Sequence, residues 1–312
     1  MTTQLGLEGM PTRLFSCTPS RLTTWLDCPR RYRMTYLDRP GPQKGPPWAH
    51  NAVGSVVHLA LSRWWSEPVQ RRVPATGRAL VERAWTTDGF ADTTQADRFR
   101  EHAAGMVERY LADVDPLDEP IGVERTVATR SQALAISGRV DRVDLRGDEL
   151  VVVDYKTGRS VLTADDARGS LALALALYAL ACQRTLRRDC TAVELHHLPT
   201  GRVARFDHTA ESLARHLSRA EAIGAEAVAA AEALRAGGDP EQLLAGPQRT
   251  QHRRHRRRQV AARLGVADGA GEVEGAGATV GEGCLAATAR KWPWTYAGAA
   301  APPGVVVLTV PL

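Results

Sequence analysis

Asp154 and Lys156 stand two positions apart at the end of the apolar segment 149–156, whose composition is typical of a strand. Side chains alternate with period two along a strand, so both groups project from the same face. A carboxylate beside an ammonium can hold a divalent cation and polarise a phosphate oxygen, which suits hydrolysis of a phosphodiester bond. The alternative for this pair alone is a surface ion pair at a strand end.

The lysine is unusual in this chain. Among 40 Lys and Arg residues, the lysines are Lys44, Lys156 and Lys291. The arginine guanidinium stays charged and spreads its hydrogen-bond donors over a wide planar group. The lysine ammonium is a compact point charge that can approach a single oxygen atom. The composition therefore indicates that position 156 uses a lysine for a chemical reason.

A second carboxylate, Asp141, lies in the strand-like segment 137–145. The turn residues 146–149 follow it and predict a β-hairpin with the next strand. Asp141 shares its face with apolar side chains, where an ionised carboxylate costs free energy unless a cation accompanies it. We expect the hairpin to bring Asp141 and Asp154 together at one end of a sheet, as in a metal-dependent nuclease.

Together with segments 18–36 and 54–58, these motifs resemble the PD-(D/E)XK nuclease superfamily, and within it the branch of RecB-type exonucleases and Cas4-like proteins. The resemblance covers roughly residues 14–235, with four separated motifs in the family's order. The resemblance implies the metal ligands His58, Asp141 and Asp154, and the catalytic residues Lys156, Asp154 and Asp141.

From the residues alone, His58 is a weaker candidate than the carboxylates. It lies in segment 54–65, whose apolar residues have helical spacing, and a single histidine there is more often a satisfied core residue. A mixed imidazole and carboxylate site is compatible with Mg²⁺ or Mn²⁺, and imidazole favours Mn²⁺.

Two further residues could support this site. Glu124, in the strand-like segment 123–128, is implied by the resemblance as a supporting acid, and the alternative is an exposed carboxylate beside Arg125. Tyr178 ends the alanine–leucine helix 170–178 and is implied as a DNA contact. The glutamine that the family places a turn earlier is missing, so Tyr178 could instead be a core residue with a hydrogen-bonded hydroxyl.

The first helical segment combines basic and aromatic residues, namely Arg21, Arg30, Arg31 and Arg33 with Trp25, Tyr32 and Tyr36. Arginines can neutralise phosphates while aromatic rings stack on unpaired bases, which predicts DNA binding. The alternative is an amphipathic helix whose aromatic face belongs to the core, as we expect for Trp25.

Cysteine usage bears on a possible iron–sulfur cluster. The resemblance implies a [4Fe–4S] cluster held by one N-terminal cysteine, placed like Cys28, and three closely spaced C-terminal cysteines. Beyond residue 190 this chain has only Cys284, so its cysteines do not support the cluster. Cys28 is therefore expected to be a free, half-buried thiol and a vestige of the family pattern.

Composition sets outer bounds on class and compartment. Five scattered cysteines argue against a disulfide framework, and the N-terminus lacks a secretion signal, so a reduced, cytoplasmic setting is expected. The longest apolar run, near 171–182, is too short to span a bilayer. No phosphate-binding loop of an ATP motor occurs, so any helicase would be a separate subunit.

The C-terminal part changes character after residue 246. Six arginines and two histidines fall within 249–258, and Gly/Ala/Val-rich sequence without clear periodicity follows. We expect a nuclease domain over 14–246, with a helical part at about 14–115 and a catalytic core at about 120–235. Residues 247–312 are interpreted as a frameshifted reading of a GC-rich gene or as a disordered basic arm that binds nucleic acid.

The order of predicted elements indicates an α/β fold, in which helices flank a mixed central sheet and a helical subdomain precedes it. It matches the restriction-endonuclease-like core that the resemblance implies. The expected function is a Mg²⁺- or Mn²⁺-dependent DNA nuclease acting on single strands or duplex ends, in repair or recombination. The alternatives are a non-cleaving DNA-binding or scaffold subunit of a repair complex, and a product that does not fold stably.

Overall fold

The computed structural model describes residues 14–41, 45, 47–158, 169–239 and 305–307. Its helices and helical turns are α1 (Pro19–Asp27), α2 (Pro29–Tyr32), η1 (Arg33–Leu37), α3 (Ala49–Trp65), η2 (Val69–Arg71), α4 (Pro74–Ala84), α5 (Thr93–Ala112), α6 (Ser170–Leu186) and α7 (Ala210–Arg235). Its strands are β1 (Phe15–Cys17), β2 (Gly122–Arg130), β3 (Leu134–Arg146), β4 (Glu149–Lys156), β5 (Ala192–His197), β6 (Arg202–Asp207) and β7 (Val305–Val307).

The strands form one mixed, seven-stranded sheet in the order β1-β3-β4-β5-β6-β7, with β2 also paired to β3. The long strand β3 pairs with β2 over most of its length and with β4 toward its C-terminal end. The β3–β4 turn is the predicted one, and Gly147 adopts the positive φ of 62° that the turn requires. The β4–β5 pair is parallel because α6 crosses between these strands.

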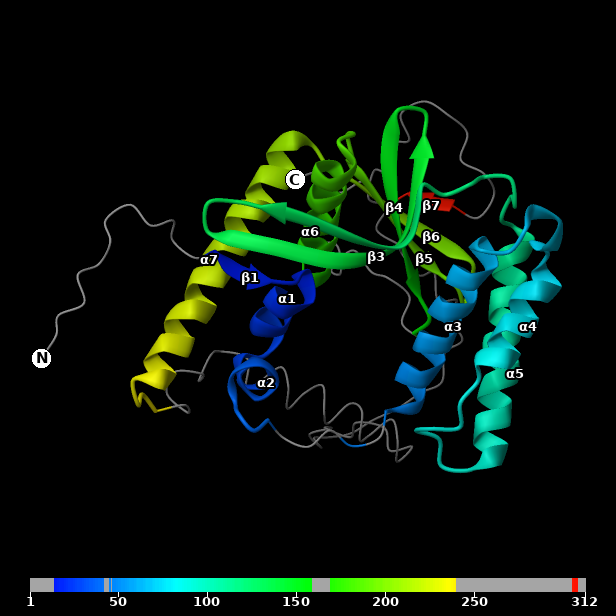
Figure 1. Cartoon of the computed structure of the whole chain (residues 1–312), viewed down its shortest axis with the longest axis horizontal. Coiled ribbons are helices and arrows are strands. Elements are labelled where there is room, and N and C mark those ends of the chain that lie inside the picture. The colour runs from blue at the N-terminus through cyan, green and yellow to red at the C-terminus, as the bar shows by residue number, and fades with distance from the viewer. Residues whose placement is uncertain (1–13, 42–44, 46, 159–168, 240–304, 308–312) are drawn as a thin grey trace, which may run out of the picture.

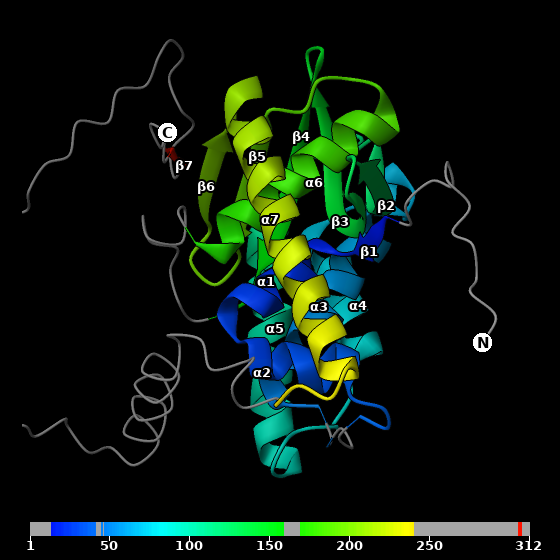
Figure 2. The same ribbon diagram turned by 90° about the vertical axis from the view of Figure 1, so that its left-hand side faces the viewer.

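Helices cover both faces of this sheet (Figures 1 and 2). On one face, α3, α4 and α5 pack against Val153 and Tyr155. On the other, α6 packs against Val152 and Val193, and α7 lies beside α6 and α1. Neighbouring residues of β4 thus enter different cores, because side chains alternate across the sheet. The α/β architecture with a helical N-terminal part is confirmed.

The first helical segment is not one continuous helix. Pro29 lacks an amide hydrogen, so the chain breaks at Cys28 and restarts as α2, with a π-helical turn after it. The short strand β1, which pairs in parallel with β3, was not expected. Apart from Val305–Val307, the interpretation of residues 247–312 falls outside the described part of the chain. Among the described helices, none has the length and apolar character needed to cross a membrane.

Candidate metal centre

Three acidic residues lie in one row across β2, β3 and β4. In the β2–β3 pair, Arg125 opposes Val140 and Val123 opposes Arg142, so Glu124 falls opposite Asp141. In the β3–β4 pair the last partners are Arg142 and Val153, and one further step sets Asp141 opposite Asp154. The predicted convergence of Asp141 and Asp154 therefore follows from strand register, and β2 adds a third carboxylate.

Glu124 has an unusual backbone conformation. Its φ of 48° lies in the left-handed region, which costs free energy for a residue other than glycine. Its carboxylate forms an ion pair with Arg139 at 2.6 Å, between Oε2 and Nε. Burial, followed by the negative charge of Asp141, raises the pKa of Glu124. The strained backbone thus holds a carboxylate whose negative charge is disfavoured even beside Arg139.

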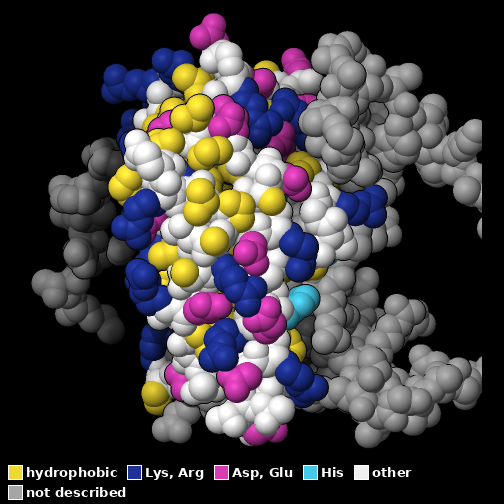
Figure 3. Space-filling view, turned by 90° about the vertical axis from the view of Figure 1, so that its right-hand side faces the viewer, with side chains coloured by type: hydrophobic (Ala, Val, Ile, Leu, Met, Phe, Trp, Pro, Cys, Tyr) yellow, Lys and Arg dark blue, Asp and Glu magenta, His cyan; other side chains and the backbone are white. Residues whose placement is uncertain are grey.

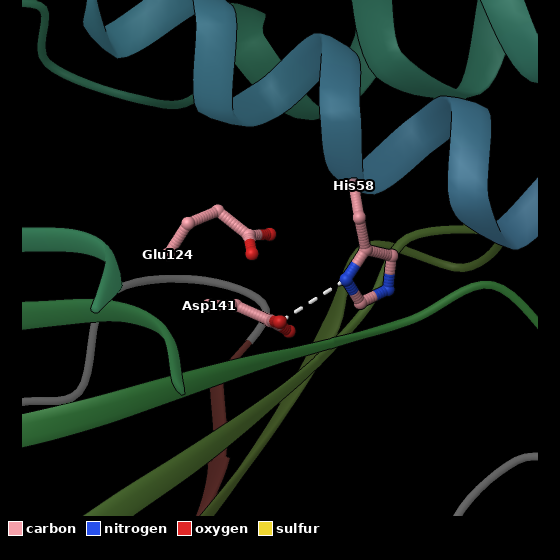
Figure 4. A group of neighbouring side chains, drawn as sticks. All are labelled: His58, Glu124 and Asp141. Atoms are coloured by element: carbon pink, nitrogen blue, oxygen red, sulfur yellow. Dashed lines mark hydrogen bonds and ion pairs between the residues drawn. The ribbon is translucent and has the colours of Figure 1, made fainter. Parts of the chain in front are cut away.

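His58 reaches this row from α3. Figure 4 shows its ring pointing to Asp141, while Glu124 approaches the same space from β2. The His58 Nδ1 atom lies 3.1 Å from Asp141 Oδ1. Ligand atoms of His58, Glu124 and Asp141 all lie within 4.8 Å of one another. Burial lowers the pKa of His58, but the hydrogen bond and negative charge of Asp141 outweigh it, so the pKa is raised overall.

Asp154 stands beside this trio rather than within it. Its Oδ2 atom forms an ion pair with Lys156 Nζ, and among the described residues no hydrogen bond of good geometry reaches this buried oxygen. Burial is the largest influence on Asp154 and raises its pKa, and the charge of Asp141 adds to this. Lys156 remains about one-third exposed. A cation at the trio would offset the repulsion between these carboxylates, so the donor set fits a divalent metal.

Tyr178 approaches the same carboxylates from α6. Its ring covers the backbone of Gly138, where an added Cβ would lie 2.6 Å from Tyr178 Cε1. Burial, together with the charges of Asp154 and Asp141, raises the pKa of Tyr178 to about 12. Its hydroxyl makes no hydrogen bond to another described residue. Tyr178 is therefore available to contact a substrate, while its ring packs as a core residue.

The candidate DNA-binding arginines of the first helix differ in their surroundings. Arg21 is held within the protein, because its Nε donates to the Tyr32 hydroxyl at 3.0 Å and its guanidinium lies over the ring of Phe15. Arg30 and Arg31 are exposed and have no ion pair among the described residues. Trp25 is buried as expected.

Cys28 is a free, half-buried thiol, as predicted. Its sulfur accepts a hydrogen bond of 3.4 Å from the Arg31 amide and so caps α2. Cys284 lies outside the described residues.

A cavity of about 1240 Å³ lies elsewhere, between the end of α5 and strands β3, β5 and β6. Three of its four arginines pair with acids: Arg142 with Asp144 at 2.8 Å, and Arg146 and Arg205 with Glu194. Asp144 is largely buried and also pairs with Arg146, whose side chain stays exposed. We therefore regard this cavity as structural and place the candidate chemistry at the trio.

The family model of the PD-(D/E)XK nuclease superfamily matches residues 16–254. A solved structure from Eubacterium rectale, of a protein provisionally assigned as an exonuclease, is similar with a TM-score of 0.46 and 11% identity, covering 73% of this chain and 86% of that one. No protein with a curated description matches significantly. The family match spans most of the chain, and the chain belongs to the PD-(D/E)XK nuclease superfamily.

Proposed function

We propose that this protein is a divalent-metal-dependent deoxyribonuclease, similar to the RecB-type exonucleases, that hydrolyses phosphodiester bonds in DNA repair or recombination. The observation that carries the proposal is the convergence of His58, Glu124 and Asp141 within 4.8 Å of one another, on the row that also contains Asp154. The family membership supports nuclease chemistry, while the repair role and a separate helicase subunit rest on resemblance alone.

His58, Glu124 and Asp141 would hold Mg²⁺ or Mn²⁺, with Asp154 as a further candidate ligand. When bound, such an ion supplies Lewis acidity toward a phosphate oxygen and acidifies a bound water. The Tyr155 amide fixes Asp141 by donating 2.8 Å to its Oδ2 atom. The remaining Asp141 oxygen and the His58 ring then face the shared space.

Lys156 supplies the positive charge that does not depend on the metal. Asp154 holds its ammonium at the end of β4, on the same face of the strand. From this position Lys156 can stabilise negative charge that develops on the phosphate oxygens and can orient the attacking water. Tyr178, which feels the charges of Asp154 and Asp141, would contact the DNA strand.

The test is cleavage of end-labelled single- and double-stranded DNA with Mn²⁺, Mg²⁺ or EDTA. Lys156→Ala should abolish metal-dependent cutting, whereas Arg83→Ala on the exposed surface of α4 should preserve it. Equal cutting by the wild type and Lys156→Ala would reject the site. A folded wild-type chain that binds DNA with every metal but never cuts it would instead identify a non-cleaving subunit.

A further inference from the structure

A small pocket between the end of β2 and the end of α6 gathers unpaired arginines. It has a volume of about 400 Å³. Thr129 lines it from β2, and Arg184, Arg187 and Arg188 line it from the last turn of α6 and the residues after it. All three arginines are exposed, and within the described chain none forms an ion pair. The pocket therefore carries an excess of positive charge.

The cavity between α5 and strands β3, β5 and β6 provides a contrast within the same protein. There Arg146 and Arg205 both pair with Glu194, so the arginines are neutralised by a buried acid. In the small pocket the lining acid is Asp189, and its Oδ1 atom accepts a hydrogen bond from Gln183 at 3.2 Å. These two arginines of the first cavity are thus paired with an acid, whereas those of the small pocket remain available to bind an anion.

Two elements connect this pocket to the candidate metal centre. Along β2, Thr129 lies five residues after Glu124, which corresponds to roughly 16 Å at the rise of a strand. Along α6, Arg184 lies six residues after Tyr178, or roughly 9 Å of helix. The Thr185 hydroxyl accepts a hydrogen bond from the Ala128 amide at 2.9 Å and donates one to the Ala128 carbonyl at 3.2 Å. These two bonds fix the helix against the strand. The pocket therefore stands at a fixed short distance from the site.

We propose that Arg184, Arg187 and Arg188 bind the phosphate backbone of the nucleic-acid strand, a few nucleotides from the bond at the metal centre. The inference rests on the proposed function, because it assumes that the strand also occupies that centre. Arginine suits this task, since its planar fork donates two hydrogen bonds to one phosphate and keeps its charge. In the competing role, the arginines only stabilise α6, because their positive charges lie near the negative end of its helix dipole. That role requires no ligand.

The test is the salt dependence of binding of a labelled single-stranded oligonucleotide in EDTA. The double variant Arg184→Gln/Arg188→Gln is compared with the wild type and with Arg83→Gln/Arg98→Gln. The control removes the same charge from exposed positions of α4 and α5, on the side of the molecule where Figure 3 shows basic and acidic side chains interspersed. Arg187 is left unchanged because its φ of 54° is left-handed, so a substitution there could alter the backbone as well as the charge.

Loss of two phosphate contacts should reduce the slope of log K against log salt by about 1.4 and weaken binding roughly tenfold or more at 0.1 M salt. The control should match the wild type, and all three proteins should give the same circular dichroism spectrum. A wild-type slope in the folded double variant would overturn the inference. A lower Tm with an unchanged slope would assign the arginines to the helix end and would overturn it too.

The same samples separate this inference from the proposed function. If the wild type cuts DNA with Mn²⁺ but the variant keeps its slope, only the inference fails. If the slope falls in a chain that never cuts, the phosphate site stands and the nuclease proposal fails. Absence of any oligonucleotide binding by the wild type would contradict both.

Discussion

The main-chain amide of Tyr155 donates a hydrogen bond of 2.8 Å to Asp141 Oδ2. Tyr155 is itself buried, and its ring meets the ring of His58 edge-on, with 6.0 Å between centroids. One core residue therefore orients two of the three side chains that converge on the candidate metal position. The geometry of the site is set by packing of β4 against α3, as pre-organised sites require.

Asp141→Asn should abolish cleavage while leaving the fold intact. The amide oxygen of asparagine can still accept from Tyr155, but the charge that binds a cation is lost. Mutation of residues that only support metal ligands typically lowers metal affinity or activity by about 10- to 100-fold. Loss of the ligand itself should therefore lower the cleavage rate by at least about a hundredfold. Single-turnover cleavage with Mn²⁺ measures the effect, and retention of wild-type activity would remove Asp141 from the site.

Glu124→Gly should be more stable than Glu124→Ala in the absence of metal. Both substitutions remove the carboxylate, but only glycine adopts the φ of 48° without strain. The expected difference is about 1 kcal/mol in the free energy of unfolding. Urea denaturation in EDTA measures it, and equal stability of the two variants would show that the backbone of residue 124 is not strained.

Addition of Mn²⁺ should raise the Tm of the wild type by several degrees. An ion at 100 times its Kd stabilises the folded state by about 2.7 kcal/mol if it binds only that state. His58→Ala should reduce this gain, whereas His102→Ala on the exposed surface of α5 should keep it. Thermal melts with and without Mn²⁺ provide the measurement, and an equal gain in all three proteins would place the ion elsewhere.

Acid should destabilise the fold through His208. Burial, followed by the charge of His216, lowers the pKa of His208 from 6.5 to about 4. The unfolded chain then binds more protons than the folded one between these values, so stability is present above pH 6.5 and is lost as the pH falls toward 4. The loss should amount to a few kcal/mol.

His208→Gln should flatten this dependence. The exposed His102→Gln substitution, in contrast, should follow the wild type. Urea unfolding between pH 7 and pH 4 compares the three proteins. A His208→Gln variant that loses as much stability as the wild type would assign the effect to another group.

Period-two alternation and a short turn were sufficient to predict where Asp141, Asp154 and Lys156 lie. Their placement depends on two adjacent strands, whose register the hairpin sets. The family resemblance added His58, whose helix comes from a distant part of the sequence. These features were available because each is either local or carried by a recognisable motif.

Other features depend on tertiary structure and could not be predicted. The left-handed φ of Glu124 leaves no signal in the residue type. The sequence therefore predicted Glu124 only as a supporting acid and not as a member of the trio with His58. The internal contacts of Arg21 depend on β1, which is only three residues long. The Arg184–Arg188 pocket was missed because its significance depends on the three arginines having no ion-pair partner among the described residues, although three arginines near the end of the alanine–leucine helix were a visible signal.

The most direct test is a crystal of the wild-type protein soaked in Mn²⁺ and measured at a wavelength where manganese scatters anomalously. The account predicts an anomalous peak bonded to the side chains of His58, Glu124 and Asp141, at about 2.0–2.3 Å from their ligand atoms. A Mn²⁺ peak at other residues, or a trio that stays empty at saturating Mn²⁺, would contradict it.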